Sequence, residues 1–380
     1  MSFTLTPEEA LIQQTAKEFA DKELAPLASK IDQTGEVPRA ILEKMASLGF
    51  LGMLTPEAYG GAGLSNLALA LVQLEINRAC ASTGVTLSVH NSLVCGPIKK
   101  FGTDAQKQAW LPKLAAAEIY GAYCLTEPNA GSDAAALETT ARLDGDHWVL
   151  SGTKIWVTNG GIAGLFVVYA RTDPKVSKAK GISAFLVPRD TPGVSIGKHE
   201  KKTGIRASST TEVIFENARI PKDNLLGELN KGFSVAMDTL DGGRIGIASQ
   251  SVGIARACLE ASVKYSKERE QFGQPIANYQ AIQWKLADMS TRIDASRLLT
   301  WKAAWLRDRG ERCTQAASEA KLFASQTANF AADECLQIHG GAGYTDHFHV
   351  ERLFRDARIT EIYEGATDVQ RIVIARGVLA

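Results

Sequence analysis

The sequence predicts an α+β protein of three domains, in which a β-domain separates two helical domains. The chain has 380 residues, enough for two or three domains. Its apolar residues change from helical spacing to alternation and back again, and no strand alternates with a long helix, as a doubly wound sheet would require. We therefore expect an N-terminal all-α domain at residues 1–120, a middle β-barrel or β-sandwich domain at 121–228 and a C-terminal four-helix bundle at 229–380.

The N-terminal region carries a clear helix start signal. Thr6 precedes Pro7, Glu8 and Glu9, and both proline and acidic side chains are favoured in the first helical turn. The apolar run from Leu67 to Ile76 predicts a second, buried helix.

Short strand-like runs dominate the middle region. The segment HWVLSGTKIWVTN at 147–159 alternates bulky apolar and polar residues. LFVVYA, ISAFLVP and TEVIFE follow at 165–170, 182–188 and 211–216, separated by turn residues. Several short strands at this spacing predict a small barrel or sandwich.

Helical spacing returns after residue 230. In one segment Ile282, Leu286, Met289 and Ile293 step by four, three and four, which places them on one core-facing stripe. Glycine-containing breaks separate the segments, as in an antiparallel bundle. The expected helical segments are 231–270, 279–309, 313–338 and 349–377.

Composition argues against several functions. Lys+Arg and Asp+Glu are both 42, so no basic excess indicates binding to nucleic acid or an anionic membrane. Six scattered cysteines without a C-x-x-C pair indicate a reduced compartment and no zinc site. His347 and His349 lack partners that would complete a metal site, so we expect both to be surface or packing residues.

The compartment is expected to be cytoplasmic. The first residues have neither the apolar core of a signal peptide nor a transit pattern. The longest apolar run, near 162–170, is too short to span a bilayer. A mitochondrial matrix location would follow if a presequence had been removed.

Glu364 is the strongest candidate for a catalytic residue. It stands in segment 351–374 with two other carboxylates, and Gly365 directly after it weakens a helix. Thr367 followed by Gln370 reads as a capping box that begins a new helix. Glu364 is thus expected at a break between helices, where desolvation and nearby acids raise its pKa toward that of a usable base.

No dinucleotide fingerprint is present, but one loop suits a phosphate group. The glycine clusters at 60–63 and 340–343 do not form G-x-G-x-x-G after a strand. In YCLTEPNAGSDAAA, Pro128 and Gly131 define a turn, and Ser132 or Asp133 can cap the segment after it. Backbone N–H groups in such a turn can bind pyrophosphate oxygens.

Six motifs in order resemble those of the acyl-CoA dehydrogenases, flavoenzymes that desaturate acyl-CoA thioesters. The resemblance covers nearly the whole chain and is closest to the short-chain, butyryl-CoA branch. The family has the same order of α, β and α domains, with the flavin between the β-domain and the bundle. The matching segments are LTEPNAGSD at 125–133, GTKIWVTNGG at 152–161, DGGR at 241–244, REQFGQPIANYQ at 269–280, QIHGG at 337–341 and EIYEGATDVQR at 361–371.

The resemblance implies FAD as cofactor and assigns contacts to it. The contacts from REQFGQPIANYQ and QIHGG would reach the FAD of a neighbouring subunit. The implied FAD contacts are Tyr123, Leu125, Thr126, Gly131, Ser132, Trp156, Val157, Thr158, Arg269, Phe272, Gln280, Gln337, Ile338, His339, Gly340, Gly341, Ala366, Thr367 and Asp368. The implied substrate contacts are Ser132, Asp241, Gly242, Gly243, Arg244 and Gly365.

The same resemblance implies the reaction. Glu364 would remove the α-proton of the thioester while a β-hydride passes to flavin N5, giving a trans-2-enoyl-CoA. Some relatives carry the base just before the arginine of the D-x-x-R turn, but here that position is Gly243, which supports Glu364. Ala366 departs from the family's usual threonine, which puts one flavin hydrogen bond in doubt.

Partners and alternatives follow from the family. Reduced FAD would pass its electrons to an electron-transferring flavoprotein, and the shared cofactor site requires at least a dimer, commonly a tetramer built as a dimer of dimers. Short branched acyl-CoA substrates compete closely with butyryl-CoA, and a reductase running the reaction backward is a further alternative. A non-catalytic scaffold and a flavin oxidase or monooxygenase on the same fold are the alternatives from other classes.

Overall fold

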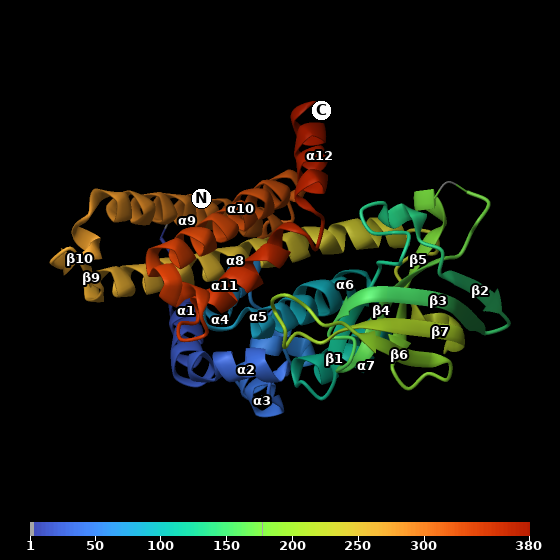
Figure 1. Cartoon of the computed structure of the whole chain (residues 1–380). Helices are drawn as coiled ribbons and strands as arrows, with labels where there is room; N and C mark the ends of the chain where they lie inside the picture. The colour runs from blue at the N-terminus through green and yellow to red at the C-terminus, as the bar shows by residue number, and fades with distance from the viewer. Residues whose placement is uncertain (1–3, 177) are drawn as a thin grey trace.

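The computed structural model describes residues 4–176 and 178–380. Helices come first along the chain, a β-sheet comes next, and long helices complete it (Figure 1). The sheet lies at one end of the molecule, and the long C-terminal helices extend away from it over the N-terminal helices (Figure 1). The predicted order of α, β and α regions is therefore confirmed.

The first helix begins where the sequence predicts. Thr6 Oγ1 accepts a hydrogen bond from the N–H of Glu9 at 3.2 Å, and Glu9 Oε2 accepts one from the N–H of Thr6 at 2.8 Å, forming a capping box. The apolar run at 67–76 lies in the buried α4, as expected. The α-helices of this region are α1 (Pro7–Phe19), α2 (Ala28–Thr34), α3 (Arg39–Ser47), α4 (Asn66–Ala79), α5 (Ala81–Ser88), α6 (Gly96–Phe101) and α7 (Asp104–Ala115).

The middle region forms one eight-stranded sheet, in the order β6-β7-β3-β2-β4-β5-β8, with β1 paired to β4. Most pairs are antiparallel, but β1 and β2 both run parallel to β4. The pairings follow one path and do not join its ends, β6 and β8. The strands are β1 (Tyr120–Cys124), β2 (Thr140–Asp144), β3 (His147–Thr158), β4 (Ala163–Arg171), β5 (Ile182–Pro188), β6 (Val194–His199), β7 (Thr210–Pro221) and β8 (Leu225–Leu226).

β4 is buried on both faces of the sheet. Leu165, Val167 and Tyr169 pack in one apolar cluster with residues of the N-terminal helices and the first long C-terminal helix. The alternate residues Phe166 and Val168 pack in a second cluster formed by strands. This double burial explains why LFVVYA is continuously apolar rather than alternating.

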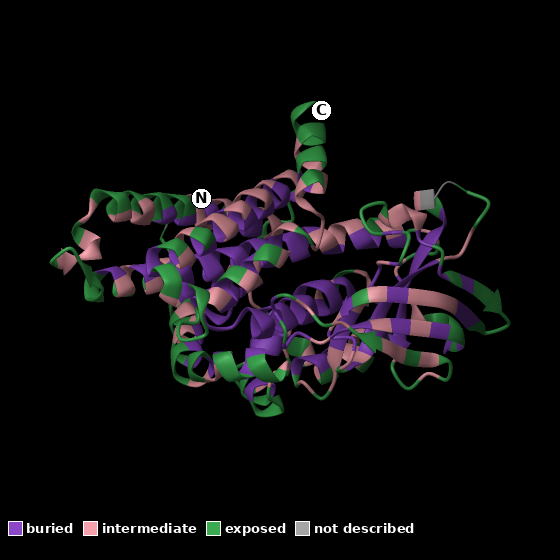
Figure 2. Ribbon diagram, in the orientation of Figure 1, coloured by how far each residue is buried: buried purple, intermediate pink, exposed green. Residues whose placement is uncertain are grey.

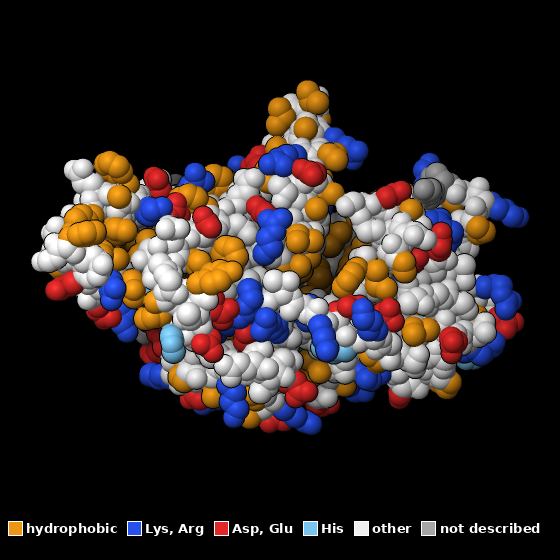
Figure 3. Space-filling model, in the orientation of Figure 1, with side chains coloured by type: hydrophobic (Ala, Val, Ile, Leu, Met, Phe, Trp, Pro, Cys, Tyr) orange, Lys and Arg blue, Asp and Glu red, His pale blue; other side chains and the backbone are white. Residues whose placement is uncertain are grey.

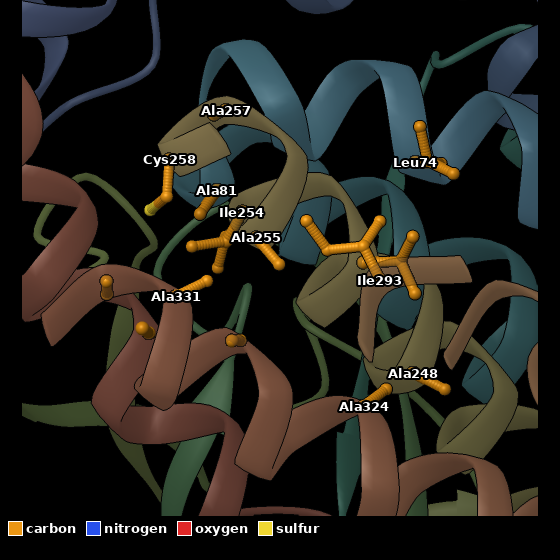
Figure 4. Packing of buried hydrophobic residues seen from close by; sticks show 14 of the residues in the cluster. Leu74, Ala81, Ala248, Ile254, Ala255, Ala257, Cys258, Ile293, Ala324 and Ala331 are labelled. Atoms are coloured by element: carbon orange, nitrogen blue, oxygen red, sulfur yellow. The ribbon is translucent and has the colours of Figure 1, made fainter. Parts of the chain in front are cut away.

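The C-terminal region is built around α8 (Gly232–Glu268), which packs against α4, α9 (Gln280–Asp308) and α10 (Thr314–His339). Small side chains on α10, such as Ala324 and Ala331, face Ala248 and Ile254 of α8 in the shared core (Figure 4). The stripe predicted on α9 is confirmed as core, since its four residues all belong to or pack against this cluster.

The fourth expected segment, 349–377, is two helices rather than one. α11 (Val350–Arg358) and a 3-10 turn (Ile359–Glu361) end before α12 (Thr367–Val378) begins. α12 stands away from the bundle (Figure 1), and most of it is exposed, with Gln370 as its buried residue (Figure 2). The break falls at residues 362–366, where the glycine after Glu364 predicted it.

The structure also places the cysteines and the two histidines singled out in the sequence. All six cysteines are free and buried. His347 and His349 are exposed, and the described residues contain no group of acidic, His and Cys side chains able to hold a metal. None of the described helices is long and apolar enough to cross a membrane.

Candidate active site

Glu364 lies in the break between α11 and α12, on a strained backbone. Its φ is +51° and that of Gly365 is +93°, so two successive residues adopt left-handed conformations. Glycine adopts such a conformation freely, but a glutamate at this φ is uncommon and costs energy. The surrounding structure must hold the turn, and the turn sets the direction of the Glu364 side chain.

The carboxylate of Glu364 points inward. The residue as a whole keeps some exposed surface, but Oε2 is buried and has no hydrogen-bond partner among the described residues. Burial raises the pKa of Glu364 to about 7, and the cations Lys321 and Arg244 oppose this rise. An unpaired carboxylate with a pKa near neutrality is suited to accept a proton.

Gly243 on α8 provides the space that this carboxylate occupies. A Cβ atom added at Gly243 would lie 2.0 Å from Glu364 Oε2 and 2.9 Å from Leu93 Cδ2. No side chain fits there while Glu364 points inward. An acidic side chain can therefore enter this space from position 243 or from position 364, but not from both.

The predicted capping box after Glu364 is wrong. Ala366 is the N-cap of α12 and makes no side-chain capping bond. The Thr367 hydroxyl instead donates to the carbonyl of Glu361 at 3.2 Å. Gln370 Nε2 donates to the carbonyl of Gly365 at 2.8 Å, so this side chain stabilises the turn rather than a helix N-terminus.

Asp241 and Arg244 lie near Glu364, inside α8 rather than in a turn. Arg244 forms an ion pair with Asp241 at 2.9 Å, and Thr314 Oγ1 donates to the other oxygen of Asp241 at 2.7 Å. Both charged side chains are buried, and Arg244 Nε has no partner in the described part of the chain. A polar ligand that entered here would find an unpaired donor beside an unpaired acceptor.

The two segments predicted to contact a flavin lie together. The N–H of Ile155 donates to the carbonyl of Thr126 at 2.9 Å, which joins the segment after β1 to β3. Trp156 has a positive φ of +58° and is 57% exposed, so it is not the core residue that a tryptophan in a strand often is. Its ring is available to cover a planar ligand.

The other residues expected at this part of the site differ in burial. Val157 and Leu125 are buried, whereas Thr126, Thr158 and Tyr123 are partly exposed. Gly131 and Ser132 lie on an exposed loop, and Asp133 makes no side-chain capping bond to the 3-10 turn Ala134–Ala136. Of the two residues expected to cap the segment, Ser132 or Asp133, Asp133 therefore does not.

A buried ion pair beneath these strands escaped the sequence analysis. Lys154 of β3 is 0% exposed and donates from Nζ to Glu127 Oε1 at 2.6 Å and to the carbonyl of Leu125 at 3.1 Å. The Glu127 carboxylate also accepts from the N–H groups of Glu138 and Thr139. Glu127 lies in the motif LTEPNAGSD and Lys154 in the motif GTKIWVTNGG. Their places in these motifs were the signal that could have pointed to the pair.

The remaining predicted cofactor contacts lie elsewhere in the same chain. Arg269, Phe272 and Gln280 are exposed at the turn between α8 and α9, and Phe272 is 95% exposed. Arg269 is 26 residues beyond Gly243, so it lies roughly 40 Å away at 1.5 Å per helical residue. One dinucleotide cannot touch both positions within one chain.

The QIHGG segment joins this distant group. Gln337–His339 end α10 and Gly340 and Gly341 follow it. The ring of His339 stacks on Tyr265 near the end of α8, with centroids 4.3 Å apart. The structure thus places the predicted contacts in two groups, one around Glu364 and Trp156 and one at the far end of α8.

Figure 3 shows a hollow in the surface between the C-terminal helices and the sheet region, with hydrophobic side chains around it. An apolar cleft with a few convergent polar groups is the usual form of a small-molecule site.

Family models match almost the whole chain in the same three parts. They are described as the N-terminal, middle and C-terminal domains of acyl-CoA dehydrogenase and match residues 6–118, 122–218 and 230–379. The chain is 52% identical over 374 residues to the bovine (Bos taurus) protein named short-chain specific acyl-CoA dehydrogenase, mitochondrial, covering 98% of this chain and 90% of the bovine protein.

Solved structures agree with the sequence matches. Butyryl-CoA dehydrogenase from Megasphaera elsdenii has a TM-score of 0.98 at 42% identity, with both chains fully covered. A glutaryl-CoA dehydrogenase from Mycobacterium smegmatis in complex with FADH2 has a TM-score of 0.93 at 33% identity, covering 98% of this chain and 95% of that one.

Proposed function

The chain belongs to the acyl-CoA dehydrogenase family, and from this premise we propose that it is an FAD-dependent dehydrogenase of short-chain acyl-CoA thioesters. Butyryl-CoA is the representative substrate and trans-2-butenoyl-CoA the product. The full-length identity of 52% to a relative named for short-chain substrates supports this choice of chain length.

One observation carries the proposal of mechanism: Glu364 holds a buried, unpaired carboxylate oxygen against Gly243 of α8, which has no side chain. A base that removes an α-proton must be desolvated enough to be basic and free of competing donors. Glu364 meets both conditions. We assign it the removal of the α-proton.

Other residues of this chain bind and orient the thioester. Asp241 and Arg244 border the carboxylate on α8, and Ser132 lies on the exposed loop after β1. The N–H of Glu364 is assigned as a donor to the thioester oxygen, where negative charge develops as the proton leaves. FAD, when bound, supplies the acceptor for the β-hydride.

The residues around Trp156 fit an isoalloxazine ring. Trp156 offers an exposed aromatic face, and the segment after β1, with Leu125 and Thr126, is joined to β3 at the neighbouring Ile155. Ala366 offers no hydroxyl at the position where the family usually has threonine. The second group, Arg269, Phe272 and the QIHGG turn, is assigned to the FAD of a neighbouring subunit.

That assignment makes the protein a homo-oligomer, at least a dimer, with a tetramer of paired dimers as the expected form. An electron-transferring flavoprotein is the expected acceptor of its electrons, and a cytoplasmic location remains a prediction. The domain limits of 1–120, 121–228 and 229–380 likewise remain a proposal.

An anaerobic titration of the purified protein with C4, C8, isobutyryl and glutaryl CoA thioesters tests the proposed function. Bleaching of the flavin absorbance by butyryl-CoA at the lowest concentration is expected. Bleaching by isobutyryl-CoA alone would keep the mechanism and assign a branched substrate. A yellow protein that no thioester bleaches, or a colourless one, would contradict the proposal.

The rate of flavin reduction should depend on pH through Glu364. Since burial raises the pKa of Glu364 to about 7, the ionised base is scarce below that pH and predominates above it. We expect kcat/KM for butyryl-CoA to rise with pH through about 7 and then level off. A kcat/KM that is flat between pH 5.5 and 8.5 would contradict the assignment of Glu364 as base.

Substituting Gly243 should remove activity without removing the base. In Gly243→Ala the new Cβ meets Glu364 Oε2 at 2.0 Å, so the carboxylate must move. A displacement of about 1 Å can cost 10²-fold in rate, and we expect a loss of that order in stopped-flow flavin reduction.

Gly96→Ala on α6 is the matched control, because its Cβ would come no closer than 3.4 Å to a neighbouring atom. It should reduce its flavin at the normal rate. Normal reduction by Gly243→Ala as well would show that Glu364 does not act from the position described.

A further inference from the structure

Lys321 is a buried cation that the proposed mechanism does not yet use. It lies on α10 with 0% exposure and is among the largest fully buried side chains. No ion pair within 4.0 Å involves it in the described part of the chain, although a buried ammonium ordinarily needs a close counter-charge. Its Nζ instead donates to the carbonyl of Gly365 at 2.8 Å.

That carbonyl belongs to the turn that carries Glu364. Two side chains donate to it, Lys321 from α10 and Gln370 from α12, both at 2.8 Å. Gln370 Nε2 also lies 3.4 Å from the carbonyl of Glu364. These hydrogen bonds stabilise the turn at Glu364 and Gly365, whose positive φ angles would otherwise be unfavourable.

Lys321 also acts on the carboxylate by charge. Burial lowers the pKa of Lys321 to about 8, with Glu364 and then Glu361 opposing that fall and Arg244 adding to it. Among the groups that lower the pKa of Glu364, Lys321 comes first and Arg244 second. The two groups therefore favour each other's charged forms across the turn.

Other charged or titratable groups lie in this neighbourhood. Glu361 is held by Arg358 on the exposed side, so it does not neutralise Lys321 directly. Arg244 is already paired with Asp241. The other groups are Tyr123 from β1 and Tyr363 beside Glu364. Burial raises the pKa of both tyrosines, and the Glu364 carboxylate adds to the rise.

We propose that Lys321 is a positioning residue for Glu364: it anchors the Gly365 carbonyl, which aims the carboxylate at the space beside Gly243, and its ammonium keeps that carboxylate available as a base. The inference rests on the proposed function, because it assigns Lys321 to the same reaction. Lys321 touches neither substrate nor cofactor in this assignment and works through the turn and its charge.

The test compares Lys321→Met, Lys321→Arg and the wild type in holoenzyme, by stopped-flow reduction of bound FAD with butyryl-CoA across pH. Methionine removes the charge and the hydrogen-bond donor. The pH at which flavin reduction reaches half its maximal rate, the pH midpoint, should therefore rise by about one unit. Because a smaller fraction of Glu364 is then ionised at pH 7, the rate at that pH should fall about fivefold and recover at higher pH. Lys321→Arg keeps a cation and should return the midpoint toward the wild-type value.

A readout independent of turnover separates positioning from simple stability. Difference infrared spectra of the protonated carboxyl, assigned by its loss in Glu364→Gln, should show the band persisting to higher pH in Lys321→Met. Lys302→Met on α9 is the matched control, since Lys302 is half-exposed with its nearest carboxylate at 3.8 Å. It should leave both the midpoint and the band unchanged.

The outcomes are distinct. An unchanged midpoint and band in a folded Lys321→Met, with only the melting temperature lowered, would overturn the positioning role. If methionine prevents folding, Lys321→Gln, which removes the charge but keeps a polar side chain, must show the upward shift for the inference to stand. Full activity of Glu364→Gln would instead refute the proposed function itself, whatever Lys321 does.

Discussion

Glu364→Gln is expected to bind FAD and fold normally but to reduce the flavin with butyryl-CoA about 10²–10⁴-fold more slowly. Glutamine keeps the size of the side chain beside Gly243 and cannot accept the α-proton. The buried Oε2 has no partner to lose among the described residues, so stability should change little. Stopped-flow absorbance under anaerobic conditions measures the rate, and the flavin spectrum measures cofactor content.

Glu361→Gln is the matched control, three residues earlier in the same segment. Its carboxylate pairs with Arg358 near the surface, so removing its charge should leave flavin reduction within a fewfold of the wild type. Loss of activity in Glu361→Gln with normal turnover in Glu364→Gln would move the base to Glu361.

Glu127→Gln is expected to produce the largest loss of stability. It leaves the fully buried ammonium of Lys154 without its counter-charge at 2.6 Å. Removing one member of a buried ion pair typically costs about 3–5 kcal/mol. The Glu127 carboxylate accepts hydrogen bonds from Lys154 and from the N–H groups of Glu138 and Thr139. The single side-chain oxygen of glutamine can accept only some of these bonds.

Hydrogen exchange of the amides of Glu138, Thr139 and Ile155 would locate this loss in the sheet, and thermal denaturation would measure its size. Asp144→Asn is the matched control, because its ion pair with Arg219 at 2.7 Å is about half-exposed on the same sheet. It should leave the melting temperature unchanged. Equal effects of the two substitutions would show that burial of the Glu127–Lys154 pair contributes nothing.

The loss of stability in Glu127→Gln should depend on pH, because it comes from the charged Glu127–Lys154 pair. Burial raises the pKa of Glu127, but Lys154 and the neighbouring N–H donors more than offset this and lower it below its ordinary value. A carboxyl with a lowered native pKa contributes stability above its unfolded-state pKa and loses it as the pH falls through the native one. The difference between wild type and Glu127→Gln should therefore shrink in acid.

Much of the fold follows from patterns that are local in the chain. The capping box at Thr6, the apolar run at 67–76 and the stripe on α9 each depend on residues a few positions apart, and all three are confirmed. The break after Glu364 was predictable for the same reason, because Gly365 disfavours a helix whatever surrounds it. The six motifs also indicated the family, since each is a short run of residues.

Features that depend on distant partners were predicted less well. The capping box at Thr367 was wrong because Gln370 donates to the Gly365 carbonyl that Lys321 also binds from α10. Asp241 and Arg244 were described as part of a turn, although α8 continues through them with its buried face against α4 and α10. Local propensity is weak beside such tertiary contacts.

The sequence alone identified Glu364 as a candidate base and the chain's three-part architecture, because both rest on short-range patterns. Only the tertiary structure decided that the Glu364 carboxylate lies unpaired against Gly243, and that Lys321 and Lys154 are buried cations rather than surface lysines. Burial and electrostatic environment arise where segments far apart in the chain pack together. Lys321 and Gly365 are 44 residues apart, and no local pattern encodes their contact.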